Sequence, residues 1–284
     1  MLNKITKFQQ ILSVVGGKYK GYQKMKKVNS MIFSGFLILC AILTISCSEK
    51  STTKPDAADA FVSAKAAYND GLYEIAIQKL SEYKSKYPYS NYAVEADLLI
   101  ANCHFELGNF EEAAISYKHF IRLHPNHEKV EESLYKIGES YWKEAPDDVD
   151  REQEYTKKAI KEWSRLLAKY PNSSFAKEAR KNIEKGRRRI AGNLVFIGNF
   201  YCKQEIYHAC AYRFSQIITE FRQFPDVRKV ALEKLYLSFE ELAKIKSHNP
   251  NSDSNIYFKG LSAKELRDKS QQFKALLDKD NAAK

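Results

Sequence analysis

Two eight-residue segments of this chain share the pattern Leu-x-x-Ile-Gly-x-x-Tyr and lie 60 residues apart. They read LYKIGESY at residues 134–141 and LVFIGNFY at residues 194–201. Further upstream, a Gly, an Ala and a Pro each recur after 37 residues: Gly71 and Gly108, Ala76 and Ala113, Pro88 and Pro125. Recurrence at a fixed period of this size is typical of repeat architectures, so the chain is predicted to be an array of stacked units.

The units resemble tetratricopeptide (TPR) repeats, which carry W-x2-L-G-x2-Y on a first helix, A-x3-F on a second helix and then Pro. The third unit supplies Leu134, Ile137, Gly138, Tyr141, Ala159, Trp163 and Pro171. The fourth supplies Leu194, Ile197, Gly198, Tyr201, Cys210, Phe214 and a closing Pro225. A fifth unit starts at Leu232, and its second helix is expected over about residues 263–277. We predict an all-α fold, a TPR-type α-solenoid of about five helix-turn-helix repeats.

The small residues of each unit have a physical purpose. A Gly or Ala in the first helix lets the second helix approach closely, and an Ala in the second helix does the same from the other side. Gly in the connection permits a tight turn, and Pro after the second helix ends that helix. The predicted packing residues are Gly71, Ala76, Gly108, Ala113, Gly138, Ala159 and Gly198.

Two segments depart from a regular array. The third unit carries an acidic insertion at residues 144–155, and a helix-compatible stretch without Pro runs over about residues 174–203. That stretch is too long for one TPR helix, and we expect it to project beyond the array. The basic tract at residues 185–189 inside it is interpreted as a solvated helix face, with a contact for an acidic partner or a lipid headgroup as the alternative.

The N-terminal segment resembles a bacterial lipoprotein signal. Lys26 and Lys27 precede an apolar run at residues 31–46, which is short for a membrane span, and Cys47 follows a small residue. Cys47 is the expected lipidation site, and an uncleaved signal anchor is the alternative. The net charge of +11 includes seven lysines within residues 1–46, so residues 47–284 carry only +4. That value does not favour a nucleic-acid-binding protein.

The expected domain organisation follows from these features. Residues 1–24 are interpreted as an extension upstream of the true start, residues 25–46 as the signal peptide and residues 47–55 as a linker. Repeats 1–4 and the first helix of repeat 5 occupy residues 56–246. A polar loop over residues 247–262 leads to a C-terminal helix and tail at residues 263–284.

Three cysteines remain after Cys40 and Cys47 are assigned to the signal and the anchor. Cys103, Cys202 and Cys210 form no CxxC pair, and we interpret them as small buried core residues. Pairing of Cys202 with Cys210 across a helical hairpin is the alternative. Neither a metal-binding spacing nor a nucleotide-binding or nucleophile motif is present, so no cofactor, metal or catalytic residue is predicted.

The combination of a lipoprotein signal with these repeats resembles the BamD family, TPR lipoproteins of the β-barrel assembly machinery of the bacterial outer membrane. The resemblance covers about residues 55–245, and its more specific parts are residues 150–153 (DREQ) and 170–173 (YPNS). It implies a non-enzymatic scaffold, lipid-anchored on the periplasmic face of the outer membrane. Its implied partners are the barrel-forming subunit, the other lipoproteins of the complex and unfolded outer-membrane proteins.

The same resemblance implies that the first two repeats receive the C-terminal segment of an unfolded client. An extended segment ending in an aromatic residue suits a groove of rings and small residues. The candidate client-binding residues are Tyr68, Tyr92, Asn102, Phe105 and Tyr117, with core packing as the alternative for each. Another periplasmic TPR scaffold, such as a coordinator of cell-envelope growth and division or a pilus-assembly lipoprotein, is the alternative function.

Overall fold

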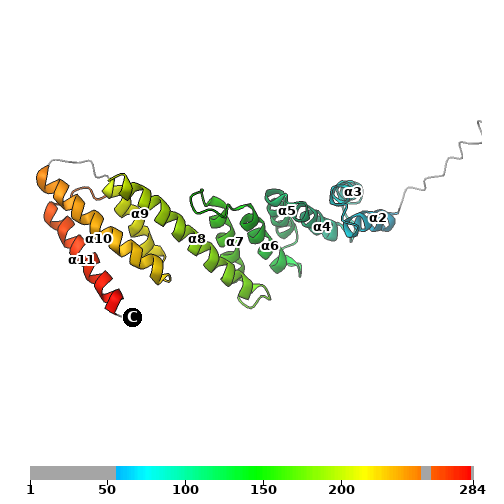
Figure 1. Ribbon diagram of the computed structural model, residues 1–284. Helices are drawn as coiled ribbons and strands as arrows, with labels where there is room; N and C mark the ends of the chain where they lie inside the picture. Colours follow the sequence, from blue (N-terminus) through cyan, green and yellow to red (C-terminus); the bar gives the residue numbers. More distant parts are fainter. Residues whose placement is uncertain (1–55, 251–256, 283–284) are drawn as a thin grey trace, which may run out of the picture. The chain divides into compact units, whose positions relative to one another are not determined.

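The computed structural model describes residues 56–250 and 257–282, and within these ranges every regular element is a helix (Figure 1). The helices are α2 (Ala57–Asn69), α3 (Tyr73–Lys86), α4 (Ala93–Glu106), α5 (Phe110–Leu123), α6 (Val130–Glu144), α7 (Glu154–Lys169), α8 (Ala176–Lys203), α9 (Tyr207–Glu220), α10 (Pro225–His248) and α11 (Ala263–Ala282). None of these helices is both long enough and apolar enough to cross a bilayer. The predicted signal, the linker and Cys47 lie outside the described residues.

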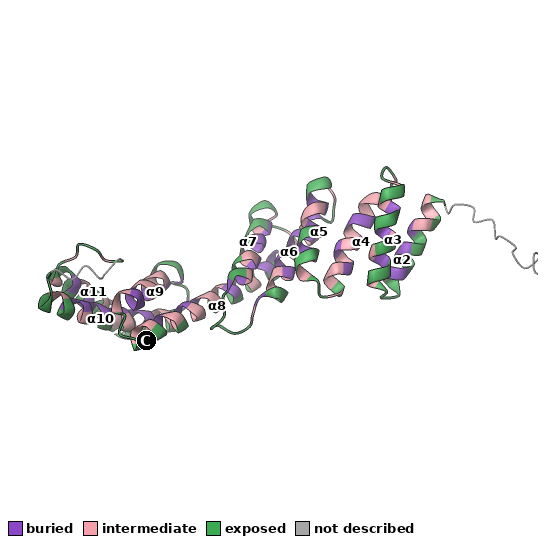
Figure 2. Ribbon diagram, turned by 90° about the horizontal axis from the view of Figure 1, so that it is seen from above, coloured by how far each residue is buried: buried purple, intermediate pink, exposed green. Residues whose placement is uncertain are grey.

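Each helix packs against the helices before and after it in the chain. Figure 2 shows that buried residues lie along the helix sides that neighbouring helices cover, whereas exposed residues gather at the turns. The core consists of three clusters, formed by α2–α4, α4–α8 and α8–α11. The result is the predicted all-α array of TPR-type helix pairs.

Gly138 and Gly198 are the contact points that the repeated octapeptide predicted. A Cβ atom on Gly138 would lie 2.4 Å from Trp163 Nε1 of the second helix, and a Cβ atom on Gly198 would lie 2.7 Å from Phe214 Cε2. Both partner rings are fully buried. The octapeptide therefore recurs because each first helix must leave room for one aromatic ring. The predicted Ala76, Ala113 and Ala159 are also fully buried.

The turns inside the first two helix pairs share one hydrogen-bonding pattern. Gly71 and Gly108 have φ values of +74° and +77°, which cost little for Gly. The Gly71 amide donates to the Tyr68 carbonyl, and the next amide, of Leu72, donates to the Ala67 carbonyl at 2.9 Å. This is the helix-ending arrangement in which Gly is favoured, so the prediction that both glycines permit a tight turn is confirmed. Neither glycine makes room for a neighbouring helix, because a Cβ atom on either one would meet nothing within 4 Å.

The fourth pair makes the same turn without glycine. The Glu205 amide donates to the Cys202 carbonyl, and the Ile206 amide donates to the Tyr201 carbonyl. Glu205 has a φ of 59° and is the one non-glycine residue with positive φ in the described ranges. A side chain in this region costs roughly 1–2 kcal/mol.

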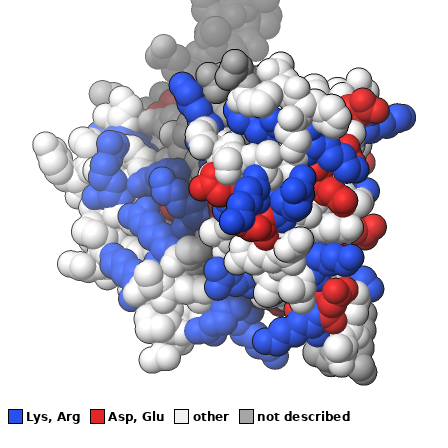
Figure 3. Space-filling model, turned by 90° about the vertical axis from the view of Figure 1, so that its left-hand side faces the viewer, with Lys and Arg blue, Asp and Glu red and all other residues white. Residues whose placement is uncertain are grey.

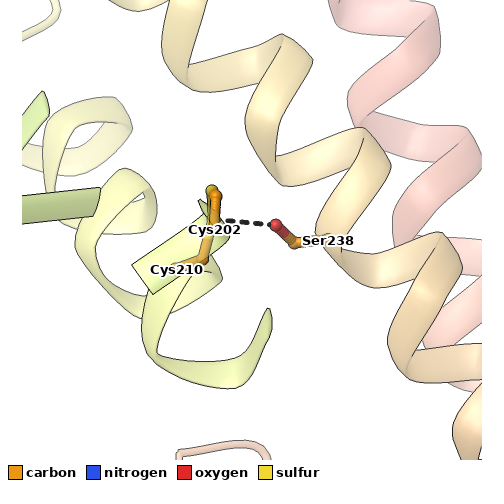
Figure 4. Close-up of a disulfide and its surroundings, with 3 residues drawn as sticks. All are labelled: Cys202, Cys210 and Ser238. Atoms are coloured by element: carbon orange, nitrogen blue, oxygen red, sulfur yellow. Dashed lines mark hydrogen bonds between the residues drawn. A yellow bond between two sulfur atoms is a disulfide. The ribbon is translucent and has the colours of Figure 1, made fainter. Parts of the chain in front are cut away.

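Cys202 and Cys210 form a disulfide that closes this turn (Figure 4). The interpretation of both as unpaired core cysteines was therefore wrong, and the alternative pairing holds. Cys210 Sγ also lies 3.0 Å from Ser238 Oγ on α10. Cys103 is free and buried, as predicted.

The long helix α8 does not project beyond the array. Its N-terminal half supplies Ala179 and Ile183 to the α4–α8 cluster, and its C-terminal half supplies Ala191 and Leu194 to the α8–α11 cluster. One uninterrupted helix thus serves both clusters, which explains its length.

Arginines of the basic tract on α8 contact carboxylates and an aromatic ring of this same chain. The tract is therefore not simply a solvated helix face. Arg189 is mostly buried: its Nη2 donates to Asp147 Oδ1 at 2.7 Å, and its guanidinium lies 3.8 Å from the Trp142 ring centroid. Arg188 forms an exposed ion pair with Asp226 at 2.9 Å. The tract therefore holds the acidic insertion against α8, because Asp147 belongs to that insertion.

The fifth pair differs from the prediction at its start. Pro225 does not close the fourth unit: α9 ends at Glu220, and Pro225 is the first residue of α10, a favoured position for Pro. The last helix α11 packs along α10, where Ser270 donates to the Tyr236 carbonyl and Phe273 stacks on Phe239. The C-terminal helix thus belongs to the array.

Candidate functional site

Three of the candidate residues lie close together across the first two repeats. The Tyr117 hydroxyl of α5 donates to Asn102 Oδ1 of α4 at 2.7 Å. The Asn102 side chain also lies near enough to the Tyr68 hydroxyl of α2 to lower the pKa of that hydroxyl. Asn102 therefore lies between the two tyrosines.

The two tyrosines on either side of Asn102 are not equivalent. Tyr117 is only 1% exposed, and burial raises its pKa far above the ordinary value. Its ring is a core element that supports Asn102. Tyr68 is half-buried; burial raises its pKa, and the nearby Asn102 side chain opposes that shift. Of the two rings, only that of Tyr68 offers a surface to another molecule.

Phe105 extends this surface by one helical turn. It lies three residues after Asn102 on α4, and residues at this spacing share one helix face. Its ring is partly buried, meets Phe110 edge-on at a centroid distance of 5.5 Å and carries Lys136 Nζ of α6 at 4.1 Å from its centroid. Lys136 also pairs with Glu139 Oε2 at 2.9 Å.

Tyr92 lies apart from the other candidates. It precedes α4, whereas Asn102 lies near the end of that helix, so about 15 Å of helix separates them at 1.5 Å per residue. Its ring stacks on Phe61 of α2 at a centroid distance of 4.7 Å and is 41% exposed. The structure thus brings together Tyr68, Asn102 and Phe105, with Tyr117 beneath them, and places Tyr92 at the opposite end of the helices.

Sequence reasoning missed Lys136 and Glu139, although the repeat register could have found Glu139. Each first helix has a small residue that contacts the second helix, and Asn102 directly follows the small residue Ala101. The same register places Glu139 directly after Gly138, and it places Tyr68 and Phe105 four residues after Ala64 and Ala101.

The surface formed by Tyr68, Asn102, Phe105, Lys136 and Glu139 is here called the α2–α4–α6 surface. It offers rings for apolar contact, an amide for hydrogen bonding and an ammonium group that is paired with the Glu139 carboxylate. Within residues 56–250 and 257–282, no cluster of side chains has the composition of a metal site. These groups suit the recognition of an extended peptide.

Comparison with known proteins gives one family match and several relatives. The chain matches the family model described as YfiO, outer membrane lipoprotein, over residues 53–255. It is 26% identical over 220 residues to the outer membrane protein assembly factor BamD of Vibrio cholerae, covering 74% of this chain and 90% of the relative. It is 25% identical over 193 residues to the protein of the same name from Neisseria meningitidis (serogroup A), covering 65% and 72%.

A solved structure with a similar arrangement is the TPR2AB-domain:pHSP90-complex of yeast Sti1. The identity is 14%, the TM-score is 0.40, and the match covers 80% of this chain and 94% of the other.

Proposed function

The chain belongs to the YfiO family of outer membrane lipoproteins, and on that premise we propose that it is a scaffold for outer-membrane protein assembly, anchored through Cys47 on the periplasmic face of that membrane. The observation that carries the proposal is the family match over residues 53–255, together with relatives named outer membrane protein assembly factor BamD. In this role the chain binds other proteins and catalyses no reaction.

We propose that the α2–α4–α6 surface receives the C-terminal segment of an unfolded client. A terminal aromatic side chain would pack between Tyr68 and Phe105, and Asn102 would hydrogen-bond to the client backbone. Lys136 Nζ, held over the Phe105 ring and paired with Glu139, would exchange the Glu139 carboxylate for the terminal carboxylate of the client. This assignment explains why rings and an ammonium group share one surface on three first helices.

The second proposed contact lies on the later repeats. Figure 3 views the molecule from the side of α9–α11, and Lys and Arg cover more of this face than Asp and Glu. Such a face suits an acidic surface on a partner. We propose that the barrel-forming subunit of the assembly complex binds here.

A binding measurement tests the client site. The purified chain in detergent micelles is titrated by calorimetry with a peptide from the C-terminus of an outer-membrane barrel protein that ends in an aromatic residue. Phe105→Ala should weaken binding about tenfold, because losing the ring contact and the support of Lys136 costs about 1.4 kcal/mol. Ile115→Ala, which truncates a 64% exposed side chain on α5, should bind like the wild type. Equal affinity for both variants, with both folded by circular dichroism, would exclude this surface as the client site.

Co-purification from gently solubilised outer membranes tests the function as a whole. Recovery of an outer-membrane barrel protein supports the assembly role. Recovery of a peptidoglycan synthase in its place would favour the role of a cell-envelope coordinator.

A further inference from the structure

Tyr89 is the most exposed large hydrophobic side chain of the described residues. It lies in the turn between α3 and α4 and is 98% exposed, whereas no other such side chain in residues 56–250 and 257–282 exceeds 64%. Its hydroxyl forms no hydrogen bond with the described residues. Water therefore surrounds the whole ring in the isolated chain, and the apolar part of the ring contributes no burial free energy to the fold.

The fold of the turn does not require an aromatic residue at this position. Three turns that link one helix pair to the next have the same proline-containing form: Tyr87-Pro88-Tyr89-Ser90, His124-Pro125-Asn126-His127 and Tyr170-Pro171-Asn172-Ser173. In each, the amide of the fourth residue donates to the carbonyl of the first at 3.1 Å. The third position is Asn in the two later turns, in keeping with the turn preference of Asn, and Tyr only in the first.

The turn of Tyr89 also lies beside the place where the described chain begins. Ala57, the first residue of α2, lines a shallow hollow of about 440 Å³ together with residues 86–91. Asp56 lies nine positions after Cys47, and even a fully extended chain of that length spans at most about 30 Å. If Cys47 carries the lipid, as the proposed function holds, the turn must remain within that reach of the bilayer surface.

We propose that the α3–α4 turn, residues 87–91, rests on the lipid surface to which the chain is tethered, with the Tyr89 ring in the headgroup layer. Tyrosine suits this layer because its ring is apolar and its hydroxyl remains hydrated. The hydroxyl of Tyr83 holds the turn in place by donating to Ser90 Oγ at 2.5 Å. The ring is therefore presented on an ordered support.

Charge contributes little to this contact. Lys86 is exposed and lies over the Tyr87 ring at 5.0 Å from its centroid, and its positive charge would attract an anionic headgroup. Asp56 and Asp59 at the start of α2 are exposed as well and oppose that attraction. The interaction is thus assigned to the aromatic ring, and it should be insensitive to salt.

The three equivalent turns supply a matched experiment. Tryptophan is introduced as Tyr89→Trp, Asn126→Trp or Asn172→Trp in the full chain, purified as the lipoprotein and bound to vesicles of phosphatidylethanolamine and phosphatidylglycerol. The vesicles contain lipids brominated near the headgroup end of the acyl chain, and the quenching of Trp142 and Trp163 in the wild type is subtracted. The proposal predicts several-fold stronger quenching at position 89 than at positions 126 and 172. Equal quenching at the three positions would overturn it.

A second variant separates the contact from the fold. Tyr89→Asn restores the residue of the two later turns and should leave the urea midpoint unchanged. On vesicles, amide hydrogen exchange of residues 86–92 should be slower in the wild type than in Tyr89→Asn, and this difference should vanish in detergent-free solution without lipid. The same exchange rate in both proteins on vesicles would contradict the proposal.

The lipid anchor on Cys47 is tested separately, by vesicle flotation and by the mass of the mature N-terminus. A chain without lipid on Cys47 that still floats refutes the proposed anchor, and the quenching contrast then still decides whether the turn meets the bilayer. A chain that does not float refutes both.

Discussion

Replacing Gly138 with Ala tests the packing rule that the repeated octapeptide expresses. The added Cβ would lie 2.4 Å from Trp163 Nε1 and 2.5 Å from its Cδ1, distances that force the indole or the helix to move. Trp163 is fully buried, and its Nε1 donates to the Tyr135 carbonyl at 3.2 Å. The ring therefore cannot yield by rotating into solvent.

The net cost follows from three contributions. Overpacking of a filled core costs about 1–3 kcal/mol, and weakening the Trp163 hydrogen bond adds about 1 kcal/mol. The helix preference for Ala over Gly returns about 1 kcal/mol. Gly138→Ala should thus lower the free energy of unfolding by about 2 kcal/mol. For a chain of this size, that change should lower the melting temperature by about 4–8 °C.

The assay is urea unfolding followed by far-UV circular dichroism, with Gly192→Ala as the matched control. Gly192 lies within α8, and a Cβ there would meet only the side chain of Val149 in the 145–153 loop, with Cγ1 at 3.2 Å and Cβ at 3.8 Å. This variant should gain up to about 1 kcal/mol from helix preference alone. In a Trp163→Leu background, Gly138→Ala should lose most of its cost, because the two residues are in contact. If Gly138→Ala proves as stable as Gly192→Ala, the close-approach argument fails.

Three further predictions concern single side chains. Glu205→Gly should raise the free energy of unfolding by about 1 kcal/mol by urea denaturation, since Gly tolerates the positive φ; no gain would show that this turn stores no strain. His104 has a buried Nδ1 without a hydrogen-bond partner in the described residues, and burial lowers its pKa while Glu112 opposes the shift. The unfolded chain then binds the proton more readily, so stability relative to His104→Gln should fall as pH drops below about 6.5, whereas parallel pH profiles would contradict this. Arg189→Lys should expose the loop of residues 145–153 to limited proteolysis, because Lys cannot bind Pro146 and Asp147 while stacking on Trp142. An unchanged cleavage rate would show that Arg189 does not hold this loop against α8.

The packing of the repeats could be predicted from the sequence because it depends on positions where only a small residue fits the backbone or the neighbouring ring. Gly138 must lack a side chain wherever a ring fills the space above it, and Gly71 must reach a positive φ wherever a helix reverses in so few residues. These constraints act within a single unit, so spacing along the chain reveals them. The second helix of the fifth unit, expected over about residues 263–277, is observed as α11.

Other features could not be predicted, because they depend on contacts between residues that are distant in sequence or on the direction in which a side chain points. Arg189 is held by Asp147, 42 residues earlier, and nothing in the basic tract indicates that partner. Cys202 and Cys210 pair because a helix reversal turns their side chains toward each other, which the spacing of eight residues alone does not determine. Tyr117 and Tyr68 look alike as candidate rings, but one points into the seam between α4 and α5 and the other lies at the surface.

The length of α8 has a consequence for how the array unfolds. Because α8 belongs to both the α4–α8 and the α8–α11 clusters, opening either cluster leaves half of one continuous helix without its packing partners. In an array of stacked units, such shared interfaces make the units unfold together.

Two probes can detect this coupling, since both tryptophans of the chain, Trp142 and Trp163, pack in the α4–α8 cluster. Tryptophan fluorescence reports that cluster alone, whereas far-UV circular dichroism reports all helices. The two urea transitions of the wild type should coincide. Lys185→Pro interrupts α8 between the clusters at a cost of about 3 kcal/mol and should separate them, whereas Lys185→Ala should not. Separate transitions in the wild type would show that α8 joins the two clusters without coupling them.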